Sequence, residues 1–231
     1  MIVSINQPCY LPWCGLFERI ARADVHVHLD DVQYSKNTFF AKNRVVDRAG
    51  REVALAVPVR AKLTDTIAEA AIPDDGWRRK HLASIVQIYG RCAPPALLDE
   101  LRALYSQPYA SLAELNVALT SWMQASMGIS TPTVLSSTLG VPGRATSRVV
   151  ALCVHLGATE YYSPAGAREY IQAEEFAAAG IKLTYQDYKP AAYDQAPHDK
   201  FVPFLSALDL LLRHGGDHAR AIILAGASAS V

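Results

Sequence analysis

The first fifth of the chain alternates apolar and polar stretches in the order of a β-α-β unit. The apolar run at 2–5 predicts a strand, the helical spacing of large apolar side chains over 13–23 predicts a helix, and the run at 25–29 predicts a second strand. Pro8 and Pro12 mark the turn between the first strand and the helix. The sequence therefore opens with two strands that we expect to lie side by side and parallel.

The predicted helix is amphipathic. Its large apolar side chains fall on one side of the helix and its charged side chains on the other. The apolar set is Trp13, Leu16, Phe17 and Ile20, and the charged set is Glu18, Arg19 and Arg22. We expect the apolar face to cover the sheet.

Polar side chains follow both strands at the point where each strand ends. They are Asn6 and Gln7 after the first strand, and Asp30, Asp31, Gln33, Lys36 and Asn37 after the second. Because parallel strands end at the same edge of a sheet, where open α/β folds bind ligands, these side chains should gather there. We expect the two aspartates and the segment 36–44 to line one pocket, with one aspartate paired to Lys36 or Arg44 and the other facing substrate.

The rest of the pattern predicts a hairpin, several helices and a second β-α-β segment. Two short runs around the turn at 48–51 predict the hairpin. Helical spacing predicts helices beginning near Trp77, at 95–105, at 112–127 and at 146–156. The last third repeats the β-α-β order with a strand at 159–162, a helix at 168–179 and a strand at 181–185. The small-residue loop at 163–167 that precedes this helix is of a kind that suits an anion.

These elements indicate the α/β class, with a mainly parallel sheet flanked by helices, a helical insertion and a second β-α-β segment. A chain of 231 residues that is 51% hydrophobic can bury one sizeable core. We expect a single domain over residues 1–231, with an N-terminal lobe of about 1–130 and a C-terminal lobe of about 131–231.

Composition excludes several classes of protein. The 22 basic and 22 acidic residues cancel, which argues against a general nucleic-acid or membrane-surface partner. The sequence opens directly into a strand and contains no apolar run of transmembrane length, so we expect a cytoplasmic protein. Its cysteines lack CxxC spacing and a zinc-type histidine pair, and we read His26 and His28 as neutral histidines on a half-polar strand. We therefore expect no metal and no cofactor.

Five blocks of sequence, in this order, resemble the WbqC-like family across nearly the whole chain. The blocks are QPCYLPWCGLFERIARADV, DDVQYSKN with KNRV after it, the helix start WRRKH, LGATEYYSPAGAREY and HDKFVPFLSALDLL. This chain has Asn6 where many members have His, and Cys9 where many have Asn or an aromatic residue. Members of the family occur in gene clusters for O-antigen polysaccharides and natural products and have been proposed to be glycine or acyl transferases. The resemblance therefore implies an acyl-type reaction.

Covalent acyl transfer needs a nucleophile, a base and an orienting carboxylate, and these roles suggest candidates. Cys9, His198 and Asp31 are the candidate catalytic residues. Without a covalent step, His198 or His81 would act as general base toward an amine or water, with Asp31 holding the acceptor. The expected substrate-binding residues are Gln7, Tyr10, Asp30, Gln33, Lys36, Asn43, Arg44, His81 and Ser163.

Three functions from different classes remain open at this point. The first is transfer of an acyl or aminoacyl group from a thioester to an amine, on a small-molecule or carrier-protein-bound substrate. The second is hydrolysis of a thioester or ester in the same site, and the third is a non-catalytic module that binds a small molecule. A homodimer is compatible with each of the three.

Overall fold

The computed structural model describes residues 1–36, 38–197 and 200–227. Asn37 and His198, which the sequence placed among the site candidates, lie outside the described residues.

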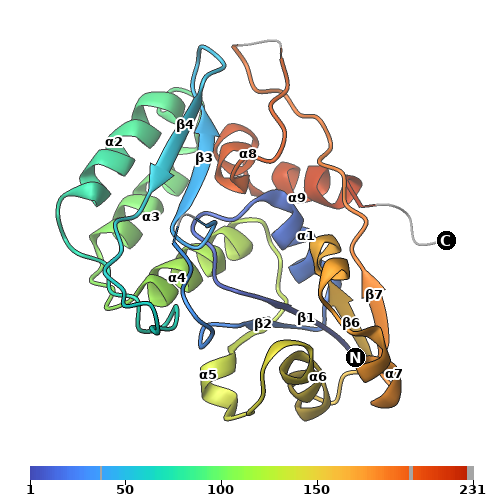
Figure 1. The fold of residues 1–231 in the computed structure, drawn as a ribbon. Helices are drawn as coiled ribbons and strands as arrows, with labels where there is room; N and C mark the ends of the chain where they lie inside the picture. The colour runs from blue at the N-terminus through green and yellow to red at the C-terminus, as the bar shows by residue number, and fades with distance from the viewer. Residues whose placement is uncertain (37, 198–199, 228–231) are drawn as a thin grey trace.

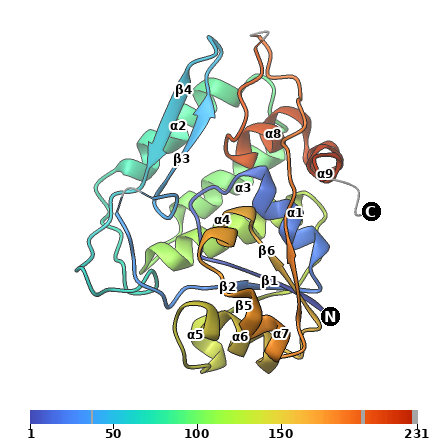
Figure 2. The ribbon, with the colours of Figure 1, turned by 45° about the vertical axis from the view of Figure 1, so that its right-hand side comes forward.

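Five parallel strands form the central sheet, in the order β5-β2-β1-β6-β7. They are β1 (Ile2–Asn6), β2 (Val25–His28), β5 (Thr133–Leu135), β6 (Glu160–Ser163) and β7 (Lys182–Tyr185). Figure 1 labels β2, β1, β6 and β7, and Figure 2 also labels β5. The predicted parallel pairing of the first two strands is confirmed, with Val3 opposite Val25 and Asn6 opposite His28. The chain adds β2 and β5 on one side of β1 and then β6 and β7 on the other. The order therefore reverses beside β1, which is the switch point of an open α/β sheet.

The helices cover both faces of the sheet (Figure 2). On one face, α6 (Ala145–His155) and α7 (Ala173–Ala178) pack against the apolar side chains of the strands, including Val3, Val27 and Tyr161. On the other face lies α1 (Cys14–Arg22), beneath a second and larger apolar cluster. That cluster is built from α2 (Trp77–Tyr89), α3 (Pro95–Ser106), α4 (Leu112–Ser126), α8 (Ala207–His214), α9 (Gly216–Ala225) and the hairpin of β3 (Lys42–Val46) and β4 (Glu52–Ala56). The α/β class and the predicted hairpin are thus present.

The orientation predicted for α1 is wrong. Leu16, Phe17 and Ile20 pack into the helical cluster, away from the sheet. The charged face of α1 meets the sheet instead, because that face of the sheet carries polar side chains that need hydrogen-bond partners. Glu18 is fully buried and accepts hydrogen bonds from the hydroxyl of Tyr162 on β6 (3.1 Å) and the amide of Gln186 (2.6 Å). We call this contact between α1 and the sheet the polar seam.

The second β-α-β segment has a shorter helix than predicted. A 3₁₀ helix (Ala165–Glu169) follows β6, and α7 begins only at Ala173. The backbone N–H of Gln172 donates to Thr146 Oγ1 (3.2 Å), which draws this part of the chain toward the start of α6. The loop at 163–167 therefore does not lead into a helix N-terminus of the kind that the sequence suggested.

Candidate functional site

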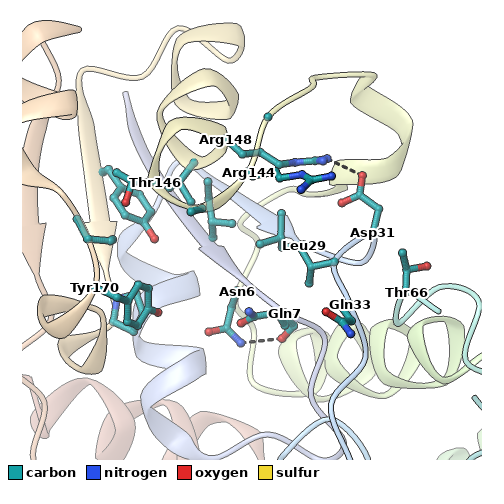
Figure 3. A pocket seen from close by; sticks show the side chains of 18 of the residues that line it. Asn6, Gln7, Leu29, Asp31, Gln33, Thr66, Arg144, Thr146, Arg148 and Tyr170 are labelled. Carbon is teal, nitrogen blue, oxygen red and sulfur yellow. Dashed lines mark hydrogen bonds and ion pairs between the residues drawn. The ribbon is translucent and has the colours of Figure 1, made fainter. Parts of the chain in front are cut away.

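A cavity of about 760 Å³ opens at the carboxyl edge of the sheet, beside the switch point (Figure 3). Its walls come from the ends of β1, β2 and β6, from the start of α6, and from residues 170–171. Of the predicted site residues, Gln7, Asp31 and Gln33 line it. The volume and the position both match those of small-molecule sites in open α/β folds.

Asp31 is held at the rim of this cavity by α6 and α5 (Ser136–Leu139). Its Oδ2 lies 2.5 Å from Nη2 of Arg148, and its Oδ1 accepts a hydrogen bond from the hydroxyl of Ser136 (2.6 Å). The predicted ion pair with Lys36 or Arg44 is therefore wrong. Arg44 pairs with Glu52 across the hairpin (3.0 Å), and Lys36 is exposed outside the cavity lining.

Asp30 has a different environment from its neighbour. It is buried, and its carboxylate accepts hydrogen bonds from the hydroxyl (2.6 Å) and the backbone N–H (3.0 Å) of Ser137. It also shares the single hydroxyl proton of Ser136 (3.0 Å) with Asp31. These bonds tie the start of α5 to the end of β2. Asp30 thus supports the cavity wall without lining it.

The turn after β1 holds Cys9 as a thiol. The Cys9 Sγ donates to the carbonyl oxygen of Gln7 (3.3 Å), and burial raises the pKa of the thiol to about 11, although Arg19 and Asn6 act in the opposite direction. The thiolate is the reactive form, so this environment disfavours a nucleophile at neutral pH. Cys9 does not contribute to the cavity lining.

Arg19 lies beneath the floor of the cavity. It is buried, and its Nη2 donates to Oδ1 of Asn6 (2.8 Å), whose amide nitrogen in turn donates to the carbonyl oxygen of Gln7 (2.7 Å). This chain of bonds fixes the orientation of the Asn6 amide in the floor. It also places a cationic group next to the lining residues.

Tyr10, His81 and Asn43 support the turn after β1 from inside the helical cluster. The Tyr10 hydroxyl hydrogen-bonds Nδ1 of His81 (2.8 Å), and burial lowers the pKa of His81 to about 4. The side-chain amide of Asn43 donates to the carbonyl oxygen of Leu11 (2.7 Å). None of the three lines the cavity, and Ser163 is buried at the end of β6 just before Pro164, which does.

No group of three or more histidine, cysteine, aspartate or glutamate side chains in the described ranges could hold a metal ion. His26 and His28 lie on the α1 side of β2 with their ring centroids 4.9 Å apart, and His26 Nδ1 hydrogen-bonds the hydroxyl of Ser4 (2.7 Å). Burial lowers the pKa of both rings, so both are neutral at pH 7. Nor does any described helix combine the length and the apolar character needed to cross a membrane.

The sequence model of the WbqC-like protein family matches residues 7–221. The chain belongs to this family. It is similar to the Uncharacterized protein Rv1507c of Mycobacterium tuberculosis (strain ATCC 25618 / H37Rv), at 30% identity over 218 residues, which cover 93% of this chain and 94% of that protein. No solved structure matches the chain.

The cavity contains residues that sequence reasoning missed, namely Arg144, Thr146, Arg148 and Tyr170. The loop at 140–143 leading into a helix was visible in the sequence, and a strand, a loop and a helix in that order form the usual frame of an α/β ligand site. The missing information was the strand order: β5 lies beyond β2 at one edge of the sheet and β6 lies on the other side of β1, so the segment that joins them crosses the switch point.

Proposed function

We propose that this WbqC-like protein is an acyl-type transferase, which moves an acyl or aminoacyl group from a thioester to an amine on a small molecule bound in the cavity. The observation that carries the proposal is the position of Asp31. A carboxylate stands in the rim of a ligand-sized cavity at the switch point, and the side chain of Gln7 lines the same cavity. Such a carboxylate can orient an amine, and the Gln7 amide can hydrogen-bond the carbonyl group under attack.

In the proposed reaction the acceptor amine donates a hydrogen bond to Asp31 and attacks the thioester carbonyl carbon. The new C–N bond forms as the C–S bond breaks, Asp31 takes the proton released by the amine, and that proton passes to the departing sulfur. Arg148 and Ser136 keep Asp31 in place throughout. We favour direct attack over an acyl-enzyme on Cys9, because the raised pKa keeps the Cys9 thiol protonated.

A binding module without catalysis is the second candidate. It is favoured by the fact that the Asp31 carboxylate is already occupied by Arg148 at 2.5 Å, an arrangement that also suits a purely structural ion pair. Hydrolysis would use the same groups with water as acceptor.

Acyl transfer can be tested with acetyl and glycyl thioesters of coenzyme A and N-acetylcysteamine, offered with a panel of amino sugars, free and nucleotide-linked. Mass spectrometry of the small-molecule fraction would detect the amide product. We expect Asp31→Asn to lower the rate at least about 100-fold, as for loss of a general base. Cys9→Ala should retain activity, and Asp75→Asn, an exposed aspartate outside the cavity, is the matched control.

Formation of amide by Asp31→Asn at the wild-type rate would refute the role of this carboxylate. An acyl adduct on the Cys9 peptide, together with an inactive Cys9→Ala, would replace direct attack by the covalent route. Binding of an amino sugar without turnover of any thioester would favour the binding module.

A further inference from the structure

The cavity has an excess of positive charge. Its charged lining residues in the described part of the chain are Asp31, Arg144 and Arg148. Arg148 is neutralised by Asp31, whereas the guanidinium of Arg144 has no ion pair or hydrogen bond among the described residues. Figure 3 shows Arg144 beside Arg148 at the same wall of the cavity. One cationic side chain is thus available to a ligand.

The backbone at the start of α6 also favours a negatively charged ligand in the cavity. Residues 143–146 are consecutive in the lining, and α6 begins among them, at Ala145, with no acidic residue in its first turn and no side-chain cap. The first N–H groups of a helix lack intrahelical partners and attract anions. A Cβ at Gly143 would come within 3.0 Å of the Arg148 Cα, so the loop runs directly against the first turn of α6.

A third cationic group, Arg19, lies beneath the cavity floor and outside its lining. Arg19 is buried under Asn6, and its own neighbour Glu18 is engaged on the far side by Tyr162, Gln186 and Arg22. Burial lowers the pKa of Arg19, while Tyr161 and Glu18 act on it in the opposite direction. Arg19 lies on α1, on the opposite face of the sheet from α6, so its charge reaches the cavity only through its hydrogen bond to Asn6.

We propose that the corner formed by Arg144 and the start of α6 binds the phosphate or diphosphate group of the substrate; this assignment rests on the proposed function. Arg148 and Ser136 together bind one carboxylate, that of Asp31. The arginine fork of Arg144 and the free N–H groups at the start of α6 suit a group with more oxygens and more charge. Tyr170, which is 70% exposed in the structure, lies across the cavity from this corner and offers a flat surface to the remainder of the ligand (Figure 3).

Two kinds of substrate carry such a group, and binding measurements separate them. Uridine diphosphate represents a nucleotide-linked acceptor, and coenzyme A represents the donor. Inorganic pyrophosphate tests the shared chemistry, and succinate tests a preference for carboxylates. Isothermal titration calorimetry would give the affinity for each at two ionic strengths, using the full chain.

We expect Arg144→Gln to weaken binding of pyrophosphate and of the preferred phosphorylated ligand at least about tenfold, as for loss of one charge-assisted contact. The exposed Arg91→Gln removes the same charge outside the cavity and should have no effect. Asp31→Asn should instead strengthen pyrophosphate binding severalfold, because it removes a negative charge from the rim and frees Arg148. If Arg144 had only a structural role, Arg144→Gln and Asp31→Asn would not be expected to change the pyrophosphate affinity in opposite directions.

The assignment is overturned if none of the phosphorylated probes binds, if succinate competes better than pyrophosphate, or if Arg91→Gln weakens binding as much as Arg144→Gln. The proposed function is judged separately by amide formation from an unphosphorylated thioester and amino sugar. Amide formation without binding of the phosphorylated probes would support acyl transfer and refute phosphate binding at Arg144 and the start of α6.

Discussion

The buried histidines of β2 should make the protein lose stability as the pH falls below about 6.5. Burial lowers the pKa of His28 from 6.5 to about 4, while the unfolded chain keeps the ordinary value. Between pH 6.5 and about 4, His28 therefore binds a proton in the unfolded state but not in the folded state. The difference corresponds to about 3 kcal/mol of unfolding free energy for His28 alone.

The contribution of His28 can be isolated with His28→Leu. Urea unfolding at pH values from 7.5 to 4 would give the unfolding free energy of wild type and variant, and the comparison of interest is the slope with pH. Wild type should lose stability steadily through this range, and the loss in His28→Leu should be smaller by about 3 kcal/mol. His155→Gln, on the exposed side of α6, is the matched control and should keep the wild-type slope.

Any constant offset between wild type and His28→Leu reflects packing and does not enter the comparison. Parallel curves for the two proteins between pH 6.5 and 4 would refute the reasoning, because they would mean that His28 can be protonated in the folded state at little cost.

Two further predictions follow from packing. Glu18→Leu should destabilise the protein by about 3–5 kcal/mol in urea unfolding, since Tyr162 and Gln186 lose the buried carboxylate that they bond. Glu52→Leu, half exposed on the hairpin, should cost less than about 1 kcal/mol. Equal losses for the two variants would contradict the importance of the polar seam. Gly216→Ala should prevent accumulation of folded protein, as judged by circular dichroism and thermal unfolding, because its Cβ would lie 1.7 Å from the carbonyl oxygen of Ser126. Gly166→Ala meets nothing within 4 Å and should fold normally, so that comparable behaviour of the two variants would show that the contact at Ser126 is relieved by movement.

Local patterns were sufficient to predict much of the fold. Apolar runs located β1 and β2, and their parallel pairing followed from the helix between them. Alternation around a turn located the hairpin of β3 and β4. These features depend on residues close together in the chain, which is why periodicity detects them.

The orientation of α1 required information that periodicity lacks. A charged helical face usually meets water, but here the opposing face of the sheet is itself polar, with Ser4, His26 and Tyr162 buried upon it. The direction of α1 was therefore decided by β6 and by Gln186, far along the chain, and no local pattern reports on them.

The candidate site was partly predictable for the same reason. Gln7 and Asp31 could be placed because they follow strands of the predicted sheet, whereas the partner of Asp31 is 117 residues away on α6. Lys36 and Arg44 were nearer in sequence and were the wrong choice. Tyr10, Asn43 and His81 are polar residues of sequence motifs whose hydrogen bonds hold the turn after β1 in place.

The polar seam also limits how relatives of this protein can be recombined. Glu18 bonds to Tyr162, which is 144 positions away, and to Gln186, which is 168 positions away. One buried carboxylate therefore joins α1 to β6 and to the residue that follows β7. A chimera that takes residues 1–130 from one parent and 131–231 from another takes this carboxylate from one parent and its hydroxyl and amide from the other. Where the parents differ at position 18, 162 or 186, such a chimera breaks the set, and the crossover points that preserve folding are those that move Glu18, Tyr162 and Gln186 together.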